Sequence, residues 1–140
     1  MTRRLSRRIL AVLLLLALGC ADGLQRAPVR GVVLVDGKPL ERGVINFLPV
    51  QGTTGPGAGG EIRNGKYALD ARKGPVIGTN RVEIRGFRKT GKQKTVMGSA
   101  VEEEIQAVPP KFNDQSTLVR EIKAGSNTLD FDLPGLKEPP

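Results

Sequence analysis

Histidine and tryptophan are both absent from this 140-residue chain. Without histidine, the chain lacks the commonest general base and the commonest transition-metal ligand. It has one cysteine, which excludes an internal disulfide and a cysteine cluster that could hold zinc. Its aromatic residues are one tyrosine and four phenylalanines, so any core is mainly aliphatic.

Glycine and proline are abundant, with 18 and 10 residues respectively. That share is typical of a protein built from strands and turns, and the length suggests one domain. The formal net charge is +8, but four arginines lie within the first eight residues. Without them the chain has 18 basic and 14 acidic residues. A balance of +4 is ordinary surface chemistry and does not indicate a nucleic-acid partner.

The first twenty residues, MTRRLSRRILAVLLLLALGC, have the three parts of an export signal. Four arginines precede ten apolar residues, Ile9–Leu18, a run shorter than the roughly 20 residues that span a membrane. ALGC resembles the lipobox of bacterial lipoproteins, which implies a signal peptide over 1–19 and lipid attachment at Cys20. The Cys20 thiol would carry a diacylglycerol and its amine an acyl chain such as palmitate. The alternatives are an unmodified thiol, and twin-arginine export through SRRIL.

Beyond Cys20, short apolar runs alternate with turn residues. We expect a tether over 20–28, one domain over 29–133 and a tail over 134–140. Strands are expected at 29–35, 44–48, 58–63, 66–70, 79–85, 117–123 and 128–133. Asp36-Gly37 and Asn64-Gly65 are type I′ turn sequences. The pattern predicts an all-β fold, a seven-stranded antiparallel β-sandwich.

Residues 55–67, GPGAGGEIRNGKY, contain two overlapping phosphate-binding patterns, G-x-G-x-x-G and G-x-x-x-x-G-K. Both patterns need a helix after the glycines, and a strand is expected here instead. We therefore expect no nucleotide and no cofactor, and read Asn64-Gly65 as a hairpin turn.

Three blocks resemble known families. VRGVVLVDGKPLERGVINFLP and GKYALDARKGPVIGTNRVEI are similar to carboxypeptidase regulatory-like domains, which have a transthyretin-like (prealbumin-like) fold. VPPKFNDQSTLVREIKAGSNTLDFDL resembles the C-terminal stretch of planctomycete-type envelope lipoproteins. The resemblance implies a seven-stranded sandwich that serves as an accessory module. Transthyretin-type hydrolases use histidine-rich sites, so that activity is not implied here.

A search for catalytic groups gives no site. Three serines, Ser99, Ser116 and Ser126, have no histidine to activate them, and the lysines stand in polar surroundings. Glu102–Glu104 form one carboxylate cluster, and Asp130 and Asp132 are expected on the outward face of the last strand. No calcium-binding loop sequence is present. We expect no catalytic residue, no metal site and no enzymatic activity.

The segment 86–108 begins basic, with Arg88, Lys89, Lys92 and Lys94, and ends acidic. It is interpreted as a long solvated hairpin, or else as a functional charged loop whose basic cluster touches anionic lipid or wall polymer near the anchor. Phe47, Tyr67 and Phe131 are expected in the core. Phe87 and Phe112 are expected to pack under loops, although they are the two candidates for an exposed binding surface.

These features predict a non-catalytic, lipid-anchored cell-envelope protein on the periplasmic or outer-surface side of a bacterial membrane. Its partners would be membrane lipid through Cys20 and an envelope protein or polysaccharide, without nucleic acid. The alternative is a soluble secreted domain that binds carbohydrate or peptide. A hydrolase is a third and remote reading.

Overall fold

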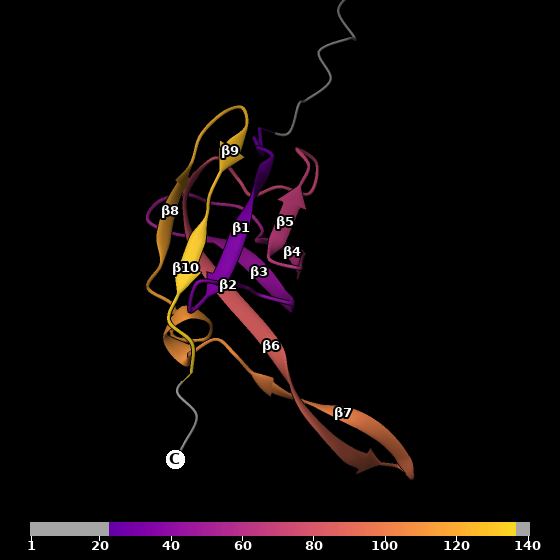
Figure 1. Cartoon of the computed structure of the whole chain (residues 1–140). Helices are drawn as coiled ribbons and strands as arrows, with labels where there is room; N and C mark the ends of the chain where they lie inside the picture. The colour runs from indigo at the N-terminus through magenta and orange to yellow at the C-terminus, as the bar shows by residue number, and fades with distance from the viewer. Residues whose placement is uncertain (1–22, 137–140) are drawn as a thin grey trace, which may run out of the picture.

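The computed structural model describes residues 23–136, and within them the protein is all-β (Figure 1). The predicted signal peptide and Cys20 lie outside the described residues. The strands are β1 (Val29–Val35), β2 (Lys38–Pro39), β3 (Arg42–Pro49), β4 (Ala58–Arg63), β5 (Lys66–Leu69), β6 (Gly78–Val96), β7 (Ser99–Gln106), β8 (Val119–Ile122), β9 (Asn127–Thr128) and β10 (Phe131–Leu133). One short 3₁₀ helix, η1 (Pro110–Phe112), follows β7.

The strands form an open, mainly antiparallel sheet in the order β10-β1-β5-β4-β3-β6-β7. Strands β2 and β9 pair with β1, and β8 pairs with β6. The pairs that β1 makes with β9 and β10 are parallel. Strands β4 and β5 are joined in register only at Arg63 and Lys66, so they diverge beyond their shared turn. The path therefore bends between a half that contains β1 and a half that contains β3 and β6.

One hydrophobic core receives side chains from both halves of the path. Phe47, Tyr67 and Phe131 are all buried in it, as predicted. The buried members of the core all come from residues 27–133. A domain of this size buries enough surface to fold alone.

The two type I′ turns predicted from sequence are present. Asn64 and Gly65 have φ angles of 49° and 76°, and Asp36 and Gly37 have 52° and 72°. Positive φ at both central positions matches the twist of the flanking strands. These turns close the β4–β5 and β1–β2 hairpins.

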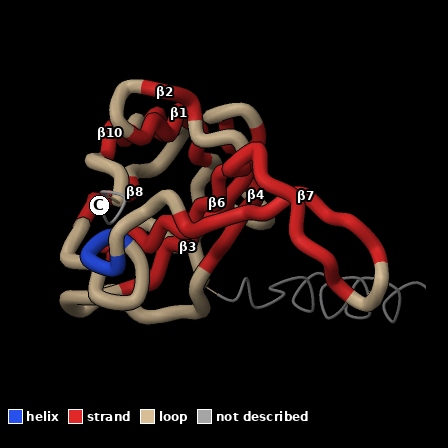
Figure 2. Tube along the Cα trace, turned by 60° about the horizontal axis from the view of Figure 1, so that its bottom comes forward, coloured by secondary structure: helices blue, strands red, loops and turns tan. Residues whose placement is uncertain are grey.

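The longest strand, β6, continues well past the end predicted for it at residue 85. It runs to Val96 and pairs with β7 as far as its tip. We call residues 88–106 the arm, and Figures 1 and 2 show it standing off the body of the molecule. All residues from 91 to 101 are exposed. The predicted solvated hairpin at 86–108 therefore exists as an extension of a body strand.

The N-terminal end of the described chain is held to the body within the segment expected to be a tether. The backbone N–H of Ile77 donates to the carbonyl of Gln25 at 2.9 Å, and the Ala27 N–H donates to the Pro75 carbonyl at 3.0 Å. Ala27 is also buried. Among the described residues, Gln25 is thus the first that bonds to the body through its backbone, and this end lies opposite the arm (Figure 1).

Candidate functional site

Cys20, the predicted lipid-attachment site, lies outside the described residues. The serines that sequence reasoning considered have ordinary structural settings. Ser116 is buried, where its hydroxyl donates to the Val82 carbonyl and accepts from the Leu118 N–H at 3.2 Å. Ser99 and Ser126 are exposed. Every lysine within residues 23–136 is exposed, so none is desolvated as a serine–lysine dyad requires.

The three carboxylates of Glu102–Glu104 do not converge on one point. Glu102 pairs with Lys89 at 2.7 Å, and this contact raises the pKa of Lys89. Glu103 accepts from the Thr90 hydroxyl at 2.9 Å. Glu104 pairs with Arg42 on β3. Each carboxylate therefore has a separate partner, two of them on the arm and one on β3.

The two aspartates near the C-terminus bind the backbone of the first strand and its turn. Asp130 accepts from the Val32 N–H at 2.8 Å, and Asp132 accepts from the Gly37 N–H at 3.3 Å. Among residues 23–136, no group of three or more histidine, cysteine or acidic side chains could hold a metal ion.

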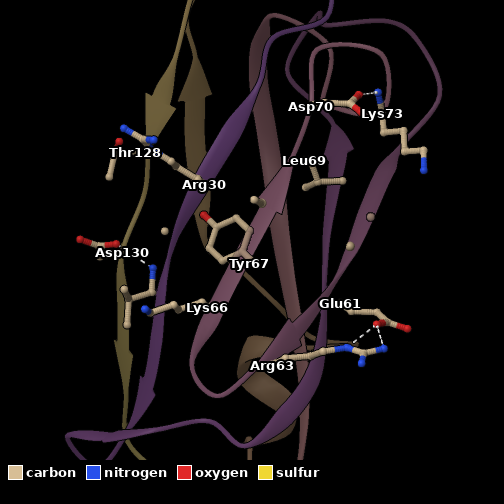
Figure 3. A pocket seen from close by; sticks show the side chains of 15 residues that line it. Arg30, Glu61, Arg63, Lys66, Tyr67, Leu69, Asp70, Lys73, Thr128 and Asp130 are labelled. Carbon is tan, nitrogen blue, oxygen red and sulfur yellow. Dashed lines mark hydrogen bonds and ion pairs between the residues drawn. The ribbon is translucent and has the colours of Figure 1, made fainter.

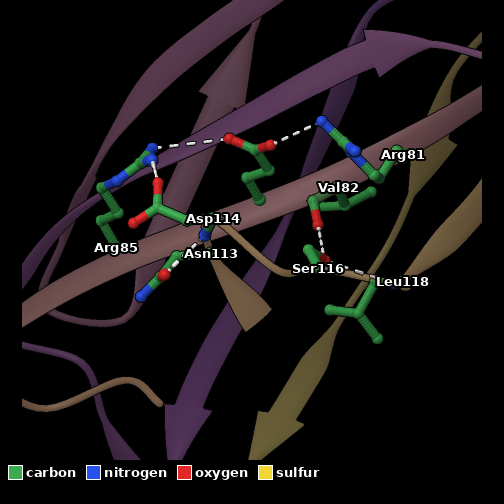
Figure 4. A network of polar contacts seen from close by, with 8 residues as sticks. Arg81, Val82, Arg85, Asn113, Asp114, Ser116 and Leu118 are labelled. Atoms are coloured by element: carbon green, nitrogen blue, oxygen red, sulfur yellow. Dashed lines mark hydrogen bonds and ion pairs between the residues drawn. The ribbon is translucent and has the colours of Figure 1, made fainter. Parts of the chain in front are cut away.

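A row of charged side chains runs along the outward side of β6 (Figure 4). Arg81 and Arg85 both contact Glu83, at 2.9 and 3.5 Å, and Arg85 also contacts Asp114 in the loop after η1. Glu83 is buried, so two guanidinium groups compensate its charge in the low-dielectric surroundings. This network fixes the loop after η1 against β6.

A shallow hollow of roughly 940 Å³ lies across β1, β5 and β4, as shown in Figure 3. It lies where β4 and β5 diverge, and glycines 31, 59 and 60 line it with bare backbone. Glu61 and Arg63 bond to each other at 2.8 Å on the β4 side. Arg30 and Lys66 stand on the β1–β5 side, without an ion pair inside the described part of the chain. Within the glycine-rich sequence at 55–67, the part that forms the β4 rim of this hollow is therefore Gly59, Gly60, Glu61 and Arg63.

The end of the arm, far from Gln25, presents apolar side chains to solvent. Met97 is 102% exposed, and Val96 and Val101 are 46% and 39% exposed. Lys92 and Lys94 are exposed beside them, and neither makes an ion pair within residues 23–136. We call residues 92–101 the tip. The sequence pattern identified the lysines of this segment but not its exposed apolar residues. Residues 96–101, VMGSAV, have no alternation of polar and apolar side chains that would show which of them are exposed.

The two phenylalanines expected under loops differ. Phe112 packs against the core, as predicted. Phe87 is 40% exposed and lines a depression beside Arg42 and Val44, so the prediction that it packs under a loop is wrong. Phe87 is the last residue of β6 that pairs with β3.

Comparison with known proteins does not identify a family. No family model matches the chain, and no curated protein matches it in sequence. One solved structure, a 9R-lipoxygenase from Cyanothece PCC8801, aligns over 79% of this chain with 15% identity and a TM-score of 0.36. The chain spans 17% of the length of that enzyme. Between residues 23 and 136, no helix is long and apolar enough to cross a membrane.

Proposed function

We propose that this chain is a non-catalytic, lipid-anchored cell-envelope protein whose β-domain serves as a structural or interaction module. The observation that carries the proposal is the spacing between Cys20 and the first fixed residue, Gln25. The lone cysteine directly follows an apolar export segment, and only four residues, 21–24, separate it from Gln25, a distance of five Cα–Cα steps. Such a stretch reaches at most about 17 Å, so the domain would be held at the membrane surface.

The fold that we propose is a transthyretin-like β-sandwich over 29–133. The divergence of β4 from β5 supports two layers, one that contains β1, β5 and β10 and one that contains β3, β4, β6 and β8. The shared core between those groups supports the same arrangement. The sequence blocks that resemble carboxypeptidase regulatory-like domains contain Asp36-Gly37 of the first type I′ turn and Gly65 of the second.

The proposal of a non-catalytic role is supported by where the candidate groups lie. Ser116 is occupied by two backbone partners, and the arm carboxylates each have a separate partner. These groups hold the fold and the arm together, which is a structural use of polar side chains.

Mass spectrometry of the mature N-terminus tests the proposal. We expect a chain that begins at Cys20 and carries two or more acyl chains, since two chains anchor stably where one does not. Cys20→Ser should release the protein from the membrane fraction into the soluble fraction. An unmodified N-terminus beyond Cys20 would overturn the lipid anchor.

The second candidate is a soluble secreted domain that binds carbohydrate or peptide. The hollow favours it, because two diverging strands present backbone edges there, with the cationic side chains of Arg30 and Lys66 beside them. A glycan and peptide array probed with residues 20–140 tests this function. Binding that Lys66→Gln weakens and Lys38→Gln leaves unchanged would support the hollow as the site, and an array without signal would remove this candidate.

A further inference from the structure

Met97 at the end of the arm occupies a backbone conformation that methionine does not favour. Its φ angle is +49°, in the left-handed region. The other non-glycine residues with positive φ between residues 23 and 136 are Asp36, Gln51 and Asn64, all polar. Asparagine and aspartate ease this conformation by bonding to nearby backbone, which a thioether does poorly. Met97 is also fully exposed, so neither turn geometry nor packing explains an apolar side chain here.

The neighbours of Met97 give it the character of an amphipathic surface. Val96 and Val101 are exposed large hydrophobic residues of the same tip. Lys94 lies opposite Val101 across the hairpin, and Lys92 precedes it. The acidic residues of the arm begin only at Glu102, and Lys89 already neutralises that one. The tip thus combines an apolar end with two lysines set behind it.

We propose that the tip docks onto the anionic headgroup layer of the membrane that carries the Cys20 anchor, a step that rests on the proposed function. A convex apolar end suits a bilayer, because lipid closes around it without a complementary pocket. Lysines just behind the apolar residues can reach anionic headgroups while their stems stay in apolar surroundings. Figure 1 shows the arm free of the body on both sides, so nothing in residues 23–136 covers the tip.

Gln25, which follows Cys20 by five positions in the sequence, and the tip lie at the two ends of one strand. β6 begins at Gly78, next to Ile77, which bonds to Gln25, and it ends at Val96. Its 19 residues span up to roughly 60 Å at about 3.3 Å per residue. A short linker between the lipid and Gln25 lets the long axis lie along the bilayer, which brings the tip to the same surface. Because the anchor holds the tip at a high effective concentration, a weak contact suffices.

The first test measures the tip without the anchor. The mature chain, residues 20–140 with Cys20→Ser, is co-sedimented with phosphatidylcholine vesicles and with vesicles that contain 30% phosphatidylglycerol. We expect binding only to the anionic vesicles, weakened by salt. Lys92→Gln with Lys94→Gln should lower the partition coefficient about 25-fold, at about fivefold per lysine. Lys123→Gln, an exposed lysine after β8, is the matched control and should leave it unchanged.

Met97→Asn separates a membrane role from a structural one. Asn-Gly is the preferred type I′ sequence, so this variant should melt at the same temperature as the parent or higher. We expect it to bind anionic vesicles several-fold more weakly. Equal binding to both vesicle types, or full binding by Met97→Asn or by the double lysine variant, would overturn the proposal.

The second test places the docking on the anchoring membrane. Two variants of the acylated protein, Met97→Cys and Lys123→Cys, are each labelled on the new thiol with an environment-sensitive fluorophore. The variant labelled at position 123 is the control. In anionic vesicles, the label at 97 should shift to the blue and the label at 123 should not. Clustering with added anionic vesicles without a blue shift would assign the tip to an opposing membrane. A shift that appears only with added envelope protein would assign it to a protein partner, and either result refutes the proposal. Loss of acylation refutes the anchor and leaves the co-sedimentation result standing.

Discussion

Replacing Gly31 with alanine should destabilise the protein, because the backbone that connects β9 to β10 occupies the space that a side chain would need. A Cβ atom at Gly31 would lie 1.9 Å from the carbonyl oxygen of Leu129 and 2.7 Å from its carbonyl carbon. The contact is with backbone, so a side-chain rotation cannot relieve it. The Leu129–Asp130 backbone must therefore move away from β1.

Three hydrogen bonds hold that backbone in place and give the magnitude. The Leu129 N–H donates to the Arg30 carbonyl at 2.9 Å, and the Tyr67 hydroxyl donates to the Leu129 carbonyl at 2.7 Å. The Val32 N–H donates to Asp130 at 2.8 Å. At about 1 kcal/mol each, their loss lowers the free energy of unfolding by about 3 kcal/mol. Alanine regains up to about 1 kcal/mol of chain entropy relative to glycine, which leaves a net loss of about 2 kcal/mol.

Urea unfolding followed by circular dichroism measures this loss, and Gly23→Ala is the control because no atom lies within 4 Å of its Cβ position. The melting temperature should fall by about 8 °C for Gly31→Ala. Tyr67→Phe removes one of the same hydrogen bonds, so the two changes together should cost less than the sum of each alone. A loss below about 0.5 kcal/mol for Gly31→Ala, or strict additivity with Tyr67→Phe, would refute this account.

Three further predictions follow from burial and from charge. Tyr67 is the single tyrosine, and burial raises the pKa of its hydroxyl. Absorbance at 295 nm should therefore not rise near pH 10, but only as the protein unfolds at higher pH. The stability that the protonated hydroxyl contributes is present below pH 10 and lost above it. Normal titration near pH 10 in folded protein would contradict this. Leu40 is buried over Gly43 and Gly86, and Leu40→Ala should lower the free energy of unfolding by about 2–5 kcal/mol in urea titrations, whereas exposed Leu24→Ala should change it little. The backbone N–H groups of Lys73 and Arg72 lower the pKa of Asp70, so the contribution of its carboxylate to stability is present above the ordinary pKa of 3.8 and is lost as the pH falls through the pKa of the folded state. Asp70→Asn should flatten the acid side of a plot of melting temperature against pH. An unchanged slope would rule the effect out.

Local signals predicted those parts of the fold in which one face of a strand is buried. Val82 and Ile84 alternate with charged residues, and the structure buries both of them at the predicted strand. Asn64-Gly65 required positive φ and has it. These signals are strong because a shift of one residue would move every side chain to the other face.

The arm and the N-terminal contact were harder to predict, for different reasons. From Arg88 to Val96 both faces of β6 meet solvent, so no apolar alternation marks the strand, and it persists only because β7 pairs with it. Gln25 and Ala27 contact the segment before β6 through backbone hydrogen bonds. Backbone groups are the same in nearly every residue, so the side-chain pattern does not predict this contact. The hollow likewise depends on where β4 and β5 part, a property of the whole sheet. Cys20 remains a prediction from the sequence.

The continuous course of β6 has a mechanical consequence. A force applied between the N-terminal end and the tip acts along this strand, whose ladder with β3 contains eight residue pairs and whose ladder with β8 contains four. Tension along a strand loads these hydrogen bonds together in shear, whereas a sideways pull on the hairpin would open its pairs one at a time. The domain is therefore stiff along the line that joins its two ends and compliant across it, and the bulge between Lys89 and Gln93 is the point at which the arm can bend.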